Sequence, residues 1–98
     1  MSQPVACNIG ALNPEERIEY RNLVKSVVLG SAATKRSFSN GYEFTYESGL
    51  FAKVSRWIEL EHRCCPFLDF ELSVGEEEVR VRVKGPVEAK EILDAAFA

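Results

Sequence analysis

Two segments of this 98-residue chain alternate between apolar and polar side chains, and this pattern constrains the fold more than any other feature. Alternation with a period of two predicts half-buried β-strands, with one face toward a core and the other toward solvent. The first segment, residues 34–47, carries aromatic side chains at every second position from 42 to 46. The second, residues 67–84, holds two such runs separated by a glycine and three glutamates. Each segment is therefore predicted to form a β-hairpin.

The turn residues predict the register of both hairpins. In the first, Asn40-Gly41 is a strong turn signal, and a three-residue loop from Ser39 to Gly41 places Phe38 opposite Tyr42. Gly41 would then take a positive φ as a β-bulge. In the second hairpin, a four-residue loop keeps the valines together on one face and sets acidic residues opposite basic ones on the other.

Helical signals precede, separate and follow the two hairpins. Asn13 and Glu16 match a capping box at the start of the first helix. Residues 49–65 are predicted to form the second helix, and a third follows Gly85. The predicted order is α-β-β-α-β-β-α within one domain, residues 1–98. An α+β fold follows, with two layers: a four-stranded antiparallel sheet and helices on one of its faces.

Helical periodicity selects the apolar side chains that should face the sheet. The predicted positions are Ile18, Leu23, Val24, Val27 and Val28 in the first helix, Leu50, Phe51, Val54, Trp57 and Ile58 in the second, and Val87, Ile92, Leu93, Ala96 and Phe97 in the third. Pro66 should end the second helix because proline cannot continue the backbone hydrogen bonding.

Composition and charge exclude several classes of protein. The formal net charge is −3, which argues against nucleic acid as a partner because phosphate binding requires a clustered basic surface. No apolar run approaches the length of a membrane span, and we expect neither a signal peptide nor a membrane partner. A cytoplasmic location is therefore expected. Three cysteines are an odd number and fit a disulfide framework poorly, so free thiols are expected.

The segment Glu61-His62-Arg63-Cys64-Cys65 concentrates the reactive side chains of the chain. On a helical wheel Glu61, Cys64 and Cys65 continue the apolar face of the second helix, whereas His62 lies at its edge. A carboxylate on a buried face is anomalous, since burying a charge without a partner is costly. Cys7, the only other cysteine, is expected to approach this group from the short segment before the first helix.

Three functions are compatible with these residues. The first is binding or sensing of a soft metal ion, zinc, copper(I) or mercury(II), through thiolates with Glu61 or His62. The second is a thiol enzyme or redox protein in which one of the vicinal cysteines is the nucleophile and the other resolves, so that a small thiol-reactive ligand would be its partner. The third is an interaction domain whose cysteines are inert core residues. The sequence leaves a homodimer open.

The motif resembles one found in a small, largely uncharacterised bacterial domain, similar to the C-terminal segment of some mercury-regulator-type transcription factors. The resemblance covers most of the chain and rests on Glu61-x-x-Cys64-Cys65-Pro66-Phe67-x-x-Phe70-x-Leu72, Ala6-Cys7, Gly41-Tyr42 and Gly85-Pro86. The family pattern often has Arg or Gln at the position of His62, so the resemblance favours the three cysteines and Glu61 as the site. No DNA-binding part is expected within these 98 residues, and the resemblance implies a site rather than a reaction.

Overall fold

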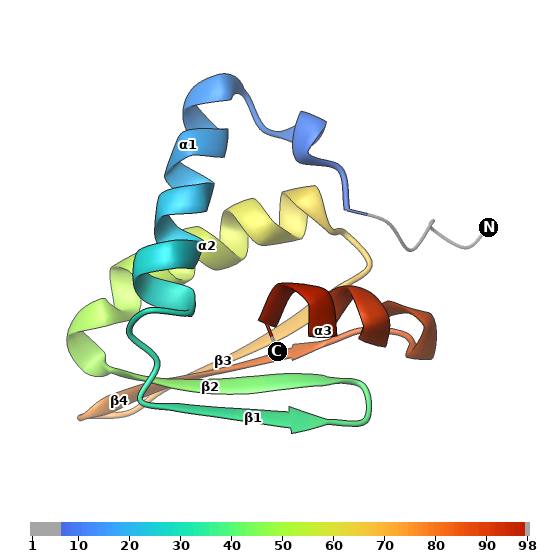
Figure 1. Cartoon of the computed structure of the whole chain (residues 1–98). Coiled ribbons are helices and arrows are strands. Elements are labelled where there is room, and N and C mark those ends of the chain that lie inside the picture. The colour runs from blue at the N-terminus through green and yellow to red at the C-terminus, as the bar shows by residue number, and fades with distance from the viewer. Residues whose placement is uncertain (1–6, 98) are drawn as a thin grey trace.

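The computed structural model describes residues 7–97, which form a four-stranded antiparallel sheet with three α-helices on one face (Figure 1). The predicted order of elements and the α+β fold class are confirmed. The strands lie in the order β1-β2-β4-β3, which makes β1 and β3 the edges. The elements are α1 (Pro14–Leu23), β1 (Thr34–Phe38), β2 (Gly41–Glu47), α2 (Phe51–Cys64), β3 (Asp69–Val74), β4 (Glu78–Lys84) and α3 (Lys90–Phe97), with short helical turns at Ile9–Ala11, Val24–Val28, Ser48–Leu50 and Val87–Ala89.

The capping box predicted at the start of α1 is present. The Asn13 side chain accepts from the backbone N–H of Glu16, and the Glu16 side chain accepts from that of Asn13. Each bond satisfies an amide that the helix itself leaves without a partner. The chain continues through a π-helical turn, whose Val27 and Val28 are buried as predicted. Ile18 is exposed, so its assignment to the buried stripe was wrong.

The register predicted for the first hairpin is wrong by one residue. Phe38 pairs with Gly41 rather than with Tyr42, and Gly41 is the first residue of β2 without a positive φ. A Cβ atom at Gly41 would clash with the carbonyl oxygen of Val83, so the close approach of β4 explains the glycine better than a bulge does. Phe38 consequently lies on the polar face, beneath the guanidinium of Arg82.

The register predicted for the second hairpin is confirmed. Val74 pairs with Val79, and Glu71 lies opposite Arg82 as the charge pattern requires. Alternation predicted that the apolar face of β3 would be buried, but part of that face is exposed to solvent. Leu72 is partly exposed and Val74 is 59% exposed, because β3 is an edge strand. Only the central strands carry fully buried alternating residues.

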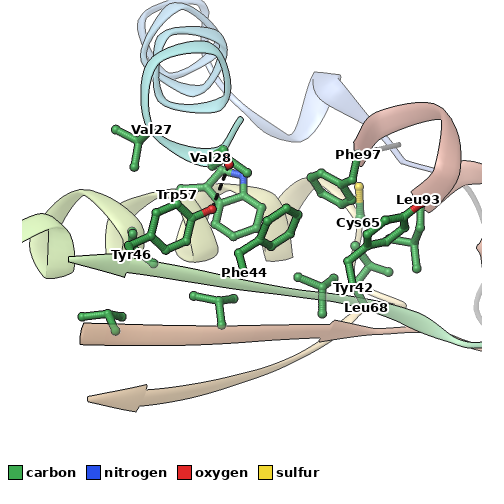
Figure 2. Close-up of a cluster of buried hydrophobic side chains, with 14 of the residues drawn as sticks. Val27, Val28, Tyr42, Phe44, Tyr46, Trp57, Cys65, Leu68, Leu93 and Phe97 are labelled. Carbon is green, nitrogen blue, oxygen red and sulfur yellow. Dashed lines mark hydrogen bonds between the residues drawn. The ribbon is translucent and has the colours of Figure 1, made fainter. Parts of the chain in front are cut away.

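The core lies between the helices and the two central strands. Figure 2 shows Trp57 of α2 and Phe97 of α3 packed over Phe44 of β2, and the Tyr46 hydroxyl donating to the carbonyl oxygen of Val28 at 2.9 Å. Cys65 borders the same cluster. The end of α2 is thus anchored to the main core of the protein.

The helical stripes were predicted only in part. In α2 the buried face includes Val54 and Trp57, but it is rotated toward Leu60 and leaves Phe51 exposed. The rotation has a physical cause: α1 and the segment before it also pack on α2, so this helix buries a second side. In the last helical segment Leu93 and Phe97 are buried, whereas Val87 and Ala96 are exposed.

Candidate functional site

The candidate site forms where the N-terminal segment crosses the end of α2. The helix ends at Cys64, and Cys65 follows it with a non-helical backbone just before Pro66. The backbone N–H of Asn8 donates to the carbonyl oxygen of Cys64 at 2.7 Å. This bond satisfies a carbonyl that the helix end leaves unpaired, and it holds the N-terminal segment against the helix. In Figure 1 the blue N-terminal segment accordingly comes down beside the yellow end of α2.

This crossing joins Cys7 to Cys65 in a disulfide across 58 residues of sequence. The prediction that Cys7 lies beside the vicinal pair is confirmed. The expectation of three free thiols is wrong, because Cys64 alone is free among the cysteines. An odd number of cysteines does not exclude one disulfide. Here the backbone bond at Asn8 holds Cys7 close to Cys65. Cys64 and Cys65 are not bonded to each other.

Glu61 is the buried carboxylate that the helical wheel predicted. It is 3% exposed, and the Tyr20 hydroxyl lies 2.9 Å from Oε2 and 3.1 Å from Oε1, so the phenol donates to this carboxylate. The Sγ atom of Cys65 lies 3.5 Å from Oε2. No Lys, Arg or His side chain forms an ion pair with Glu61 within residues 7–97. The carboxylate is therefore held by hydrogen bonds and not by a countercharge.

Burial dominates the acid–base properties of the site. It raises the pKa of Glu61 above its ordinary value of 4.5, and the Tyr20 and Trp57 donors only partly oppose that shift. Burial also raises the pKa of the Cys64 thiol, and the nearby Glu61 charge adds to the increase. The pKa of Tyr20 is raised by burial and then by the same charge. Each of these groups is therefore harder to deprotonate than it would be in water.

The ligand atoms of Glu61, Cys64 and Cys65 all lie within 4.8 Å of one another, and all three residues are buried. Cys7 is bonded directly to one of them, so all four residues that the sequence favoured meet at one point. His62 lies outside this group. It is exposed, and its ring packs edge-on against Phe70 with the centroids 6.2 Å apart.

Two residues at the site were not identified from the sequence. Tyr20 supplies the donor to Glu61 from α1, and Trp57 was assigned to the core alone. The indole N–H of Trp57 is buried and makes no hydrogen bond of ordinary geometry to the residues described, although Trp57 still lowers the pKa of Glu61. The sequence feature that could have predicted these residues is the glutamate on the buried helix face, since a buried carboxylate requires hydrogen-bond donors nearby.

Searches of protein-family models, curated proteins and solved structures found no match to this chain. The resemblance to the mercury-regulator-type segment therefore stays an expectation. Within the described residues, no helix has both the length and the apolar character needed to cross a membrane.

Proposed function

We propose that the reduced protein binds, and so senses, one soft metal ion through Cys7, Cys64 and Cys65. Glu61 would be a fourth ligand or the acceptor that orients one of the thiols. The observation that carries the proposal is the convergence of Glu61, Cys64 and Cys65, whose ligand atoms lie within 4.8 Å of one another, with Cys7 bonded to Cys65.

The spacing of these atoms supports the proposal. Sulfur atoms around one zinc ion lie about 4 Å apart, since each Zn–S bond is about 2.3 Å long. Cys64 and Cys65 already approach that separation, and Cys7 would start in contact with Cys65 after reduction. Small adjustments at the end of α2 and in the N-terminal segment would bring three thiolates to one ion.

The electrostatics of the site also favour a cation. Glu61 is buried without a positive partner among the described residues, and the Tyr20 hydroxyl only partly offsets the effect of burial. A buried carboxylate is costly unless a cation or donors compensate for it. Thiolates select soft ions, so zinc, copper(I) and mercury(II) are the candidates. The proposal also includes a cytoplasmic location, where thiols stay reduced. It includes the resemblance to the mercury-regulator-type segment as well.

Titration of the reduced protein with each ion under anaerobic conditions tests the proposal. We expect one ion per chain in the wild type and loss of binding in a Cys64→Ser/Cys65→Ser variant. Binding should release protons and weaken at low pH, because the ligands must be deprotonated. Equal affinity in both proteins would exclude the vicinal pair. Absence of binding by the wild type would leave the inert-core interpretation.

Matched variants define the ligand set. Glu61→Gln should weaken binding by roughly 10- to 100-fold if the carboxylate orients a thiol ligand. Glu59→Gln removes an exposed carboxylate from the same helix and should leave the affinity unchanged. His62→Gln should also have no effect, because His62 is exposed outside the cluster. A loss of affinity with His62→Gln would bring this residue back into the site.

A further inference from the structure

The two sulfurs of the disulfide lie in different surroundings. Cys7 is exposed at the start of the described chain, whereas Cys65 is buried where α2 ends. Exchange begins when a thiolate attacks one sulfur of a disulfide, and access decides which sulfur it reaches. The exposure of Cys7 and the burial of Cys65 therefore favour attack at Cys7.

The buried sulfur has partners ready for it. The Sγ atom of Cys65 lies 3.5 Å from Oε2 of Glu61, so a Cys65 thiol can donate to that oxygen once the disulfide opens. Tyr20 holds the same carboxylate from α1. The backbone bond from Asn8 to Cys64 keeps the exposed half of the pair close, because it does not involve either sulfur.

We propose that the Cys7–Cys65 disulfide is a redox-active site that exchanges with small thiols in solution, with Cys7 as the attacked sulfur and Cys65 as the leaving one. A monothiol first forms a mixed disulfide with Cys7 and releases Cys65 as a thiol, which takes the proton of the incoming group. A second monothiol attacks the sulfur of the first, freeing Cys7 as a thiol and leaving as the oxidised dimer. Two thiols are oxidised, one protein disulfide is reduced, and the two thiol protons end on Cys7 and Cys65.

This exchange would control the metal site. While the bond is closed, two of the three proposed thiolate ligands are committed to each other, and only Cys64 and Glu61 remain. Opening it frees Cys7 and Cys65 together. The exchange itself does not require a metal. Control of metal binding by the disulfide, in contrast, rests on the proposed function. Disulfides in reducing compartments are usually transient and serve catalysis or redox sensing, which agrees with this assignment.

Peptide mapping identifies the attacked sulfur. Oxidised protein is treated with reduced glutathione, quenched in acid, alkylated and digested, and the position of the glutathione adduct is read by mass spectrometry. We expect the adduct on Cys7. An adduct on Cys65 or Cys64 would overturn the proposal, and so would a disulfide that glutathione leaves intact. Because this experiment uses the wild-type chain, it does not depend on whether a variant folds.

Two variants sharpen the result. Cys65→Ser removes the internal thiol that resolves the adduct. When this variant is treated with oxidised glutathione, Cys7 should form a mixed disulfide with one glutathione per chain and release the other as reduced glutathione. Cys64→Ser should keep the disulfide and show the same adduct position as the wild type. If Cys64→Ser abolished the exchange, Cys64 would be the sulfur that opens the bond, contrary to the proposal. The metal titrations use fully reduced protein, so failure of either proposal leaves the other testable.

Discussion

Two glutamates, Glu61 in α2 and Glu43 in β2, lie largely out of solvent, and their surroundings differ completely. The Glu43 side chain is 11% exposed and faces the guanidinium groups of Arg36, Arg80 and Arg82, the last at 3.0 Å. Glu61 is 3% exposed and meets a phenol, an indole and two sulfurs. The first carboxylate is compensated within the fold. The second remains without a countercharge among the described residues, and this difference is why the proposed metal site lies at the Glu61 end of the molecule.

The largest expected effect concerns the disulfide, which exists only at the Glu61 end. Cys7→Ser should lower the unfolding free energy of the oxidised protein by about 4 kcal/mol, because the bond closes a loop across 58 residues. Urea denaturation with and without reductant measures this loss. In reductant the wild type and the variant should unfold alike. Equal stability without reductant would show that the bond contributes nothing.

The next effect comes from the donor to Glu61. Tyr20→Phe removes a hydrogen bond from a buried carboxylate and should cost about 1–3 kcal/mol of stability. Glu61→Ala should cost a similar amount by leaving the Tyr20 hydroxyl unpaired. Denaturant melts of both variants and of their combination test the pair. If the two losses simply add, the phenol and the carboxylate do not act together.

The pH dependence of stability should also depend on Glu61. Its raised pKa means that, above the ordinary value of 4.5, the folded protein holds a proton that the unfolded chain releases. The contribution of Glu61 to stability therefore falls as the pH rises from 4.5 toward the raised pKa of the folded state. Below pH 4.5 this contribution does not change with pH. Glu61→Gln should remove that decline, so the variant gains on the wild type as the pH increases. Parallel pH profiles of the two proteins would contradict this assignment.

The smallest effect belongs to the ion pairs of the outer sheet face. Glu43→Gln should cost no more than about 1 kcal/mol, because its arginine partners remain largely solvated. The loss should shrink as salt is added, unlike the loss for Tyr20→Phe. Denaturation at low and high ionic strength compares the two regions directly. If Glu43→Gln lowered the unfolding free energy as much as Tyr20→Phe, with the same dependence on salt, the two regions would not differ as described.

The sequence predicted those parts of the fold that follow from local periodicity. Alternation and charge complementarity placed Glu71 opposite Arg82, and the capping box located the start of α1. The register predicted for the first hairpin placed Phe38 on the apolar face with Tyr42, whereas Phe38 lies on the polar face against Arg82. The approach of β4 to Gly41, a contact between distant segments, decides that register.

The site was predicted as a set of residues and not as a bonded arrangement. The helical wheel identified Glu61 and Cys64, which follow the period of α2, and Cys65 joins them although the helix ends at Cys64. The disulfide depends on the crossing of the N-terminal segment over the end of α2, which no local pattern encodes. Tyr20 was missed for the same reason, because its partner lies 41 residues away.

Zinc binding by one preparation in two redox states tests the central claim most directly. The wild-type chain is divided into a fully reduced sample and a sample in which the Cys7–Cys65 disulfide is intact, and both are titrated with zinc against a chromophoric chelator. We expect one tightly bound ion per reduced chain and loss of that binding in the oxidised chain. Zinc binding of equal affinity in both states, or in neither, would contradict it.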